Sequence, residues 1–387
     1  MIYLDNAATT KVSETVVEGM LPFMNRKYGN PSGIYEFADQ SGKAVEHARE
    51  QVASLIGAQK KEIYFTSGGS ESDNWALKSV MEQYKDKGRH LITSKIEHHA
   101  ILETCAWLEK QGCDITYLDV DENGFVKMNQ LEKSIRKDTV CISIMTANNE
   151  IGTIQPLYEI GRLARRHNLI FHTDAVQAYG HIPIDVRECN IHLLSASAHK
   201  LHGPKGVGCL YINDTIDVPS MIYGGGQESG HRAGTENVPG IVGFGIAAEE
   251  ASRNMNLRRE KELKLRNYLM KRILWEIPYV RINGSVKRRL PNNANFSFQF
   301  VDGESLLILL DSAGICASAA SACSAGSKEP SHVLMALGMP EELAYGTLRL
   351  TVSADNTKQE MDIVVEKIKE SVSRLREMSS EMADVEQ

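Results

Sequence analysis

Several features that would place a chain in a membrane, a secretory route or a disulfide framework are missing from the sequence. No apolar run approaches the length of a membrane span, and the opening residues MIYLDNAATTKV have neither the basic nor the apolar region of a signal peptide. The seven cysteines are scattered and include no C-x-x-C pair. We therefore expect a cytoplasmic protein with reduced thiols, no metal site and no contact with a membrane. Five cysteines stand in apolar contexts and are expected in the core, namely Cys105, Cys113, Cys141, Cys189 and Cys209.

An excess of basic residues is missing as well. The 43 lysines and arginines are outnumbered by 50 acidic residues, for a net charge of −7, which argues against direct binding of nucleic acid. The glycine turn in EIYFTSGGSESDN matches neither the dinucleotide-binding nor the P-loop spacing, so neither kind of site is supported. What remains is an ordinary globular composition, 42% hydrophobic over 387 residues, long enough for two or three cores.

From about residue 36 to 212 the pattern alternates between helix and strand. Helical spacing is clear in AVEHAREQVASLIG, DNWALKSVMEQYK and LYEIGRLARRHN. Strand-like apolar runs stand at 62–67, 90–94, 114–120, 139–145, 169–175, 191–197 and 206–212. This alternation predicts an α/β fold with a largely parallel central sheet that helices cover on both faces.

A different region follows a long charged helix expected at about 240–276. Strands are expected in ANFSFQF, GICAS and TLRLTVS, with helices in ESLLILLDS and TKQEMDIVVEKIKESVSRL. We interpret this region as a smaller α+β domain that the N-terminal segment completes. The predicted division is a large domain at 15–255 and a small domain formed by 1–14 and 256–387.

Polar residues follow three of the predicted strands, at the edge where parallel α/β sheets bind ligands. The turn SGGS opens a helix, so its free N–H groups suit a phosphate, although an ordinary tight turn fits equally well. Asp174, after LIFHT, is either a helix N-cap or the partner of a cofactor's ring nitrogen. Lys200, after LLSASAH, is either a surface residue or a desolvated amine that forms a Schiff base. Together these three parts predict a pyridoxal phosphate site.

A single cysteine, Cys323, stands in the run ASAASACSAGSKEPS at 317–331, which has almost no side chain large enough to pack. An incidental buried thiol is the alternative, but the apolar neighbours that would bury it are missing. The most reactive side chain of the sequence therefore stands on a weakly anchored segment. Its rival, Cys316 in GICAS, stands in a strand-like apolar context and is expected in the core.

The motifs resemble, in order, those of a known family. They are YLDNAATT, YGNPS, TSGGSESDN, EHHA, NNEIG, HTDAVQ, SAHKLHGPKG, HRAGT and SACSAGSKEPSHVL, spread over residues 2 to about 375. Over that range the sequence is similar to the cysteine desulfurases of the NifS/IscS-like group. That group lies in class V of the fold-type-I pyridoxal-phosphate enzymes, so the resemblance implies their fold and their cofactor, pyridoxal 5′-phosphate.

The resemblance also implies a role for each matching residue. Lys200 should bind the cofactor's aldehyde, Asp174 its ring nitrogen and Gln177 its hydroxyl, while His98 should stack on the ring and shuttle protons. The remaining cofactor contacts are implied for Asn149 and, at the phosphate, for Gly69, Ser70, Ser197, His199 and, from the other subunit of a homodimer, Thr235. The substrate carboxylate should be held by Asn30 and Arg349, since a guanidinium binds a carboxylate through two hydrogen bonds.

The implied reaction removes sulfur from L-cysteine. Alanine is released, and Cys323 keeps the sulfur as a persulfide for iron–sulfur cluster assembly or tRNA thiolation, through an acceptor such as a U-type scaffold protein. Only the thiolate is reactive, and His98 is the candidate base. The alternatives are a selenocysteine lyase, another class V aminotransferase, or a non-catalytic sulfur-transfer scaffold.

Five positions depart from the family pattern. Tyr35 stands where histidine is usual and Ser70 where threonine is usual, while Ala38, Ala198 and Ala320 replace glycines. Ser70 keeps the hydroxyl, so little change in phosphate binding is expected. The alanines restrict the backbone, and Tyr35 is expected to alter the substrate entrance or the dimer edge.

Overall fold

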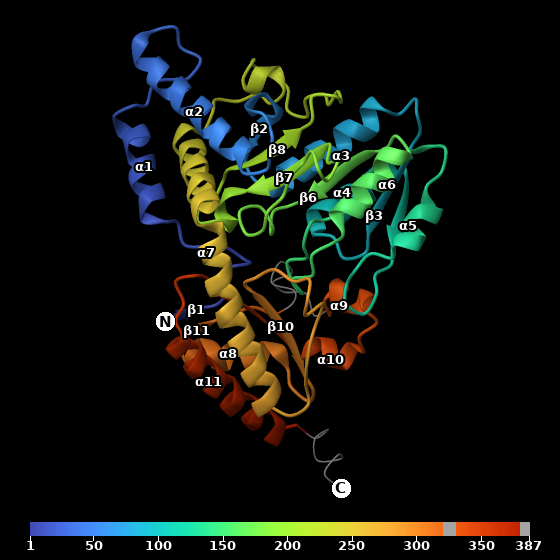
Figure 1. The fold of residues 1–387 in the computed structure, drawn as a ribbon, viewed down its shortest axis with the longest axis vertical. Helices are drawn as coiled ribbons and strands as arrows, with labels where there is room; N and C mark the ends of the chain where they lie inside the picture. Colours follow the sequence, from blue (N-terminus) through green and yellow to red (C-terminus); the bar gives the residue numbers. More distant parts are fainter. Residues whose placement is uncertain (320–329, 380–387) are drawn as a thin grey trace.

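The structure is a computed structural model that describes residues 1–319 and 330–379. Its largest sheet has seven strands in the order β2-β8-β7-β6-β5-β3-β4 (Figure 1). The strands are β2 (Ile63–Thr66), β3 (His90–Ser94), β4 (Asp114–Leu118), β5 (Thr139–Ser143), β6 (Ile170–Asp174), β7 (Leu193–Ser197) and β8 (Gly208–Ile212). Only β8 runs antiparallel to its neighbours, so the expected α/β fold with a largely parallel sheet is confirmed.

Helices cover both faces of this sheet, as the apolar strands require. Alternate strand residues pack into different clusters: Cys141 and Leu193 lie with helices α3 and α4, whereas Ile142 and Leu194 lie with α2, α6 and α7. The helices around the sheet are α1 (Glu14–Asn25), α2 (Glu36–Ser54), α3 (Gly69–Gln83), α4 (His99–Lys110), α5 (Met128–Ser134), α6 (Leu157–Arg166) and α7 (Val238–Glu276).

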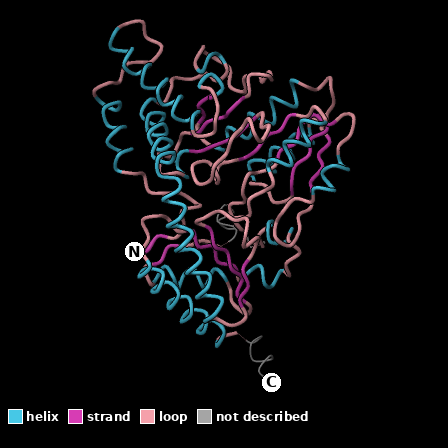
Figure 2. Tube along the Cα trace, in the orientation of Figure 1, coloured by secondary structure: helices cyan, strands magenta, loops and turns pink. Residues whose placement is uncertain are grey.

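A second group of strands lies below the large sheet (Figure 2). β10 (Asn293–Phe298) pairs antiparallel with β9 (Val280–Ile282) and β12 (Thr347–Thr351), and β1 (Ile2–Tyr3) pairs parallel with β11 (Ile315–Cys316). Their core includes apolar residues of α8 (Gly303–Ser312) and α11 (Lys358–Glu377). The short helices α9 (His332–Ala336) and α10 (Glu341–Tyr345) precede β12. The N-terminal strand therefore belongs to this second group.

α7 joins the two cores as one continuous helix of 39 residues. Its first half, including Phe244 and Ala251, packs into the core on one face of the large sheet. Its second half, including Leu265 and Ile273, packs into the core of the smaller sheets. We still propose the division into 15–255 and 1–14 with 256–387, although that boundary falls inside this helix.

The expectation for the cysteines is only partly correct. Cys105, Cys141 and Cys209 are buried, but Cys113 and Cys189 are half-buried, because they lie in connections at the ends of elements. Cys316 is half-buried as well, since its two-residue strand has a strand neighbour on one side only. No helix within residues 1–319 and 330–379 is long and apolar enough to cross a membrane.

Candidate functional site

The candidate site lies at the carboxyl edge of the large sheet. β2, β3, β5, β6 and β7 all end at this edge, because β8 alone is reversed between β2 and β7. The sequence therefore delivers most of the expected site residues to one place: Gly69 and Ser70 after β2, His98 after β3, Asn149 after β5, Asp174 and Gln177 from β6, and Ser197, His199 and Lys200 from β7.

Lys200 points its amine at the N-terminal segment. Its Nζ donates hydrogen bonds to the carbonyl oxygens of Ala7 (2.6 Å) and Ala8 (2.8 Å). The side-chain amide of Gln177 donates to Ala7 as well (3.0 Å), so the two predicted cofactor contacts meet the same stretch of backbone. The sequence reasoning gave the YLDNAATT segment no role in the site. The small residues of this segment were a signal for such a role, because small side chains leave the backbone oxygens accessible to a neighbouring donor.

Asp174 and His98 form the electrostatic centre of the site. Asp174 is 6% exposed, and its Oδ1 accepts a hydrogen bond from the N–H of Val176 (2.8 Å). Burial raises the pKa of Asp174, while the nearby His98, that N–H and Lys200 oppose this. Burial lowers the pKa of His98, so its imidazole is neutral near pH 7, although the charge of Asp174 opposes this.

The tautomer of His98 follows from its hydrogen bond. His98 is the N-cap of α4, and its Nδ1 accepts from the N–H of Ala100 (3.1 Å). A neutral imidazole that accepts at Nδ1 carries its proton at Nε2. In this arrangement Nε2 is a hydrogen-bond donor, and the role of His98 as a base stays a prediction.

The turn before α3 leaves room for an anion. Gly68 has a φ of +155°, which favours glycine, and a Cβ on Gly69 would lie 2.6 Å from Cγ2 of Val176. Ser70 follows in the first turn of a 15-residue helix, and the buried Ser197 stands at the end of β7. N–H groups at a helix start fit the phosphate of the expected cofactor.

His199 lies between the phosphate side of the site and the N-terminal segment. Its Nδ1 is 3.2 Å from the hydroxyl of Thr9, and its carbonyl oxygen accepts from the N–H of Thr10 (2.9 Å). Burial, followed by the charges of Lys200 and Lys205, lowers the pKa of His199 to about 4. A neutral His199 can donate one hydrogen bond to an anion without adding charge.

Arg349 presents a buried guanidinium beside this edge. The residue is 2% exposed, its Nη2 pairs with Asp5 (2.9 Å), and its Nη1 donates to the carbonyl oxygen of Asn149 (3.0 Å). Among the residues described, its buried Nε has no hydrogen-bond partner. A buried donor without an acceptor is costly, so a carboxylate ligand would complete this arginine.

Two expected residues are not brought to this edge within the chain. Asn30 is exposed, and its side chain accepts a hydrogen bond from Ser32 N (3.0 Å) in the α1–α2 connection. Figure 1 shows that connection at the far end of the molecule from β10, the neighbour of the strand that carries Arg349. Thr235 is exposed in the loop before α7. The roles of Asn30 and Thr235 therefore stay predictions, which require a second subunit or a different position of their loops.

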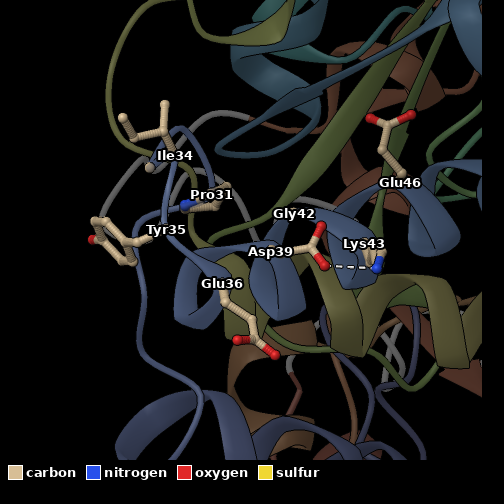
Figure 3. Close-up of a pocket in the computed structure, with 9 residues that line it drawn as sticks. Pro31, Ile34, Tyr35, Glu36, Asp39, Gly42, Lys43 and Glu46 are labelled. Atoms are coloured by element: carbon tan, nitrogen blue, oxygen red, sulfur yellow. Dashed lines mark ion pairs between the residues drawn. The ribbon is translucent and has the colours of Figure 1, made fainter.

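The α1–α2 connection borders an open groove of about 530 Å³ (Figure 3). Asp39 and Lys43 form an ion pair in it (2.6 Å), and the ring of Tyr35 points away from that pair. Tyr35 is 54% exposed and Ile34 is fully exposed. These side chains therefore belong to the outer surface, where a dimer edge is the more suitable of the two expectations for Tyr35.

The alanines that replace family glycines cause no backbone strain in the described residues. Ala38 and Ala198 are both fully buried, and neither has a positive φ. Ala198 begins a short 3-10 turn that alanine adopts freely. Ala320 lies outside the described residues.

The expected nucleophile Cys323 also lies outside the described residues, but the segments that flank it are at the site. Ser318 exchanges backbone hydrogen bonds with Arg349 (3.2 and 2.6 Å). On the other side, Nε2 of His332 donates a hydrogen bond to the carbonyl oxygen of Glu97 (3.0 Å), next to His98, and the ring of His332 lies 4.8 Å from that of His99. The described segments on either side of Cys323 therefore lie beside the predicted substrate and cofactor contacts.

This fold and this edge of the sheet match a known family over nearly the whole chain. The family model described as aminotransferase class-V matches residues 2–364. The chain belongs to this family, and its predicted resemblance to the NifS/IscS-like group with the fold-type-I architecture is confirmed.

The similar proteins include curated enzymes and solved structures. A protein named cysteine desulfurase IscS from Methanosarcina thermophila is 53% identical over 378 residues, which cover 98% of this chain and 93% of that protein. A solved structure titled NifS-like protein has a TM-score of 0.91 at 40% identity, covering 96% of this chain and 99% of the other. A structure titled SspA in complex with cysteine has a TM-score of 0.83 at 37% identity, covering 92% of this chain and 100% of the other.

Proposed function

We propose that the protein is a pyridoxal-phosphate-dependent cysteine desulfurase. The single observation that carries this proposal is the meeting of Lys200, Gln177 and Arg349 at the N-terminal segment, through Ala7, Ala8 and Asp5. The proteins named cysteine desulfurase IscS, which are 52–53% identical in sequence over 98% of this chain, support the same activity.

The described residues fit the cofactor. Pyridoxal phosphate supplies an aldehyde that captures the substrate amine and a ring that accepts electrons from it. Lys200 would hold the aldehyde end, Asp174 the ring nitrogen, and the Gly68–Ser70 turn with Ser197 and His199 the phosphate. Gln177, Asn149 and His98 would complete the contacts with the ring.

The substrate proposed for this site is L-cysteine. Arg349 would bind its carboxylate, since the buried Nε of Arg349 has no acceptor among the described residues. A neutral His98 with its proton at Nε2 would donate a hydrogen bond to the bound cofactor or substrate. We propose Asn30 as a second contact for the carboxylate, supplied by a neighbouring subunit.

The sulfur is proposed to move to Cys323. The thiolate forms a new bond to the sulfur of the bound cysteine, and the carbon–sulfur bond of the substrate breaks. The electron pair of that bond stays with the three-carbon skeleton, which takes up a proton and leaves as L-alanine. Cys323 is left as a persulfide, and no outside oxidant or reductant is needed.

A homodimer is part of the proposal. Large apolar side chains stand exposed along α1 and the connection after it: Leu21 (53%), Met24 (63%), Tyr28 (71%) and Ile34 (104%). Such a surface is typical of a protein interface. Packing of this face against a second copy would bring the large sheets of the two subunits close together. Thr235 of one subunit would then contact the cofactor phosphate bound in the other subunit.

The acceptor of the sulfur is proposed to be another protein, such as a U-type scaffold in iron–sulfur cluster assembly or a carrier for tRNA thiolation. Cytoplasmic location belongs to the same proposal, since Cys323 must return to the reduced state after each transfer. The proposal includes no direct contact with nucleic acid or membrane.

Mass spectrometry tests the activity directly. Protein saturated with pyridoxal phosphate is incubated with L-cysteine, and the peptide that contains Cys323 is expected to gain one sulfur atom while alanine appears. Cys323→Ser should lose the gain, and Cys316→Ser, as the matched control, should keep it. A yellow protein that is loaded with cofactor but forms no persulfide contradicts the proposal. Release of selenium from selenocysteine in a variant without Cys323 would indicate a selenocysteine lyase, and transfer of the amino group would indicate an aminotransferase. Protein that never binds the cofactor would indicate a non-catalytic scaffold.

A further inference from the structure

A group of buried polar side chains lies on the sheet face that α3 covers. His172 and Asp174 stand two residues apart on β6, so they share a face, and the register places Ser195 opposite Asp174 and Ser143 opposite His172. These four side chains range from 0% to 6% exposed. Burial of polar side chains has a desolvation cost that burial of apolar side chains does not have, so polar residues on this face require an explanation.

Asp73 brings a further carboxyl group to this face from α3. The residue is 1% exposed, and its Oδ1 has no hydrogen-bond partner among the residues described. That oxygen lies 3.7 Å from Nε2 of His172, too far for a hydrogen bond, and the hydroxyl of Ser195 is hydrogen-bonded to the carboxyl group. An orphaned carboxylate oxygen in a dry interior is unstable unless the group is neutral.

The neighbours of Asp73 form a hydrogen-bonded chain. Nε2 of His172 lies 3.1 Å from Oγ of Ser195, and Nδ1 lies 2.8 Å from Oγ of Ser143. Burial lowers the pKa of His172 to about 3, so the imidazole is neutral and has one donor and one acceptor. The hydrogen bonds from Asp73 through Ser195 and His172 therefore all point away from Asp73 when it carries a proton. They all point toward Asp73 when it does not.

The charged groups around the two aspartates are unequal. Burial raises the pKa of Asp73, and the charges of Asp174 and Glu97 raise it further; the hydrogen bond with Ser195 opposes this, and no cation is among the causes. Asp174 has the amine of Lys200 as a cationic neighbour, and His98 also opposes the rise of its pKa, so its ionised form is favoured over that of Asp73. Two close buried carboxyl groups do not both ionise, and the group without a cation keeps the proton.

We propose that Asp73 is the proton-holding partner of Asp174: a neutral carboxylic acid, joined through Ser195 to His172, that leaves the negative charge of the pair on Asp174. This inference rests on the proposed cofactor site, where Asp174 faces the ring nitrogen. The proton of Asp73 is donated to Ser195, the hydroxyl of Ser195 donates to Nε2 of His172, and Nδ1–H of His172 donates to Ser143. Asp73 touches neither cofactor nor substrate, so it is a positioning residue.

Three variants separate charge from shape. Asp73→Asn is neutral and keeps a donor for Ser195, Asp73→Leu keeps most of the volume but has no polar group, and Ser79→Ala is a matched control at a buried polar position of the same helix. Each full-length protein is titrated with pyridoxal phosphate, and the visible absorbance of the bound cofactor is followed against pH. An infrared difference spectrum at neutral pH compares the wild type with Asp73→Asn.

The expected results are specific to a neutral Asp73. Asp73→Asn should keep the dissociation constant of pyridoxal phosphate within about twofold and leave the pH midpoint of the absorbance unchanged, because it mimics the protonated acid. The carbonyl band of a protonated carboxylic acid should disappear in this variant. Asp73→Leu should weaken cofactor binding by about tenfold, because Ser195 and His172 lose their donor, and Ser79→Ala should match the wild type.

Other outcomes overturn the proposal. A large shift of the pH midpoint in Asp73→Asn, or no loss of the carbonyl band, means that Asp73 is ionised. Wild-type affinity in Asp73→Leu means that the chain has no influence on Asp174, and if that variant fails to fold, the infrared and pH results for Asp73→Asn still decide. None of these readouts uses cysteine turnover, so a failure of the persulfide reaction leaves them intact, whereas a wild type that binds no cofactor overturns both proposals.

Discussion

At the scale of single residues, burial separates side chains that look alike in the sequence. Lys200 and Lys205 stand five residues apart in SAHKLHGPKG, yet Lys200 is half-buried against the N-terminal segment and Lys205 is exposed in a turn. A lysine amine becomes a nucleophile only where its surroundings hold and desolvate it. The structure therefore distinguishes the two lysines by position, not by residue type.

Replacement of Lys200 tests this difference. Lys200→Ala should lower alanine formation by roughly a thousandfold and remove the visible band of the bound cofactor, because the covalent anchor is lost. The measurements are the absorbance spectrum and the rate of alanine release. Lys205→Ala is the control and should keep both; equal losses in the two variants would contradict the assignment of Lys200.

Arg349 makes a prediction of the same kind. Arg349→Lys keeps the positive charge but loses the two-point contact with a carboxylate, so the KM for L-cysteine should rise about tenfold to a hundredfold, with a smaller change in kcat. Steady-state kinetics measure the two constants. Arg281→Lys, at an exposed position of the same small sheet, should change neither, and an unchanged KM in Arg349→Lys would remove this residue from the substrate site.

At the scale of elements, α7 is the main connection between the two cores. It packs against α2 and α1 near its start and against α11 and β9 near its end, so a single helix fixes how the two groups of strands lie. The polar residues on its buried side are therefore under strong constraint. Glu262 is one of them, with 4% exposure.

Glu262 gives the helix a pH-dependent stability. Burial, with a small addition from Asp355, raises the pKa of Glu262 to about 8, and the charge of Arg258 opposes this. The folded protein therefore holds a proton that the unfolded chain releases near pH 4.5, and the stability present below that pH is lost as the pH rises to about 8.

Glu262→Gln cannot ionise, so it should match the wild type at pH 4 and be more stable at pH 8.5, by up to about 5 kcal/mol. Chemical denaturation at the two pH values measures the difference. Glu260→Gln changes an exposed neighbour on the same helix and should show no such trend. A constant difference between the Glu262 variant and the wild type across this range would mean that Glu262 is already ionised in the folded protein.

The contact between α7 and α2 depends on a glycine. A Cβ on Gly245 would lie 2.5 Å from Oε1 of Gln51 and 2.6 Å from Cα of Ala48. Gly245→Ala should therefore destabilise the protein by about 1–3 kcal/mol, because the backbone of α2 must move. Gly42→Ala, in α2 with its nearest atom at 3.4 Å, is the control and should be neutral or stabilising by up to about 1 kcal/mol. Thermal unfolding compares the two, and equal stability would show that the helices have room to separate.

At the scale of the whole molecule, we predict that a second copy of the chain contributes Thr235 to the proposed site. Hybrid dimers test this: one subunit carries Lys200→Ala and the other Thr235→Ala. If Thr235 acts across the interface, the Thr235→Ala subunit keeps its own Lys200 and receives Thr235 from its partner, so one site of each hybrid should be fully active. Rates of alanine release from the hybrid are compared with those of the two parent variants. A hybrid no better than their average would place Thr235 in its own site.

Much of the fold and part of the site could be predicted from the sequence. The seven strands of the large sheet fall within one or two residues of the apolar runs, because strands buried on both faces are rich in apolar residues. Asp174 and Lys200 could be predicted because strand ends of such a sheet meet at one edge. The reversal of β8, the burial of Arg349 and the half-exposed state of Cys316 could not, since each depends on which distant elements pack beside it.

What the sequence by itself determined is the set of chemical groups and the order of the elements that carry them. Local periodicity and turn residues are short-range properties, so they can be recognised along the chain. Only the tertiary structure decided that Ala7 meets Lys200, that Asp5 meets Arg349, and that Asp73 is buried beside His172 without a partner for one oxygen. These are contacts between segments far apart in sequence, and their energies depend on burial, which exists only once the chain has folded.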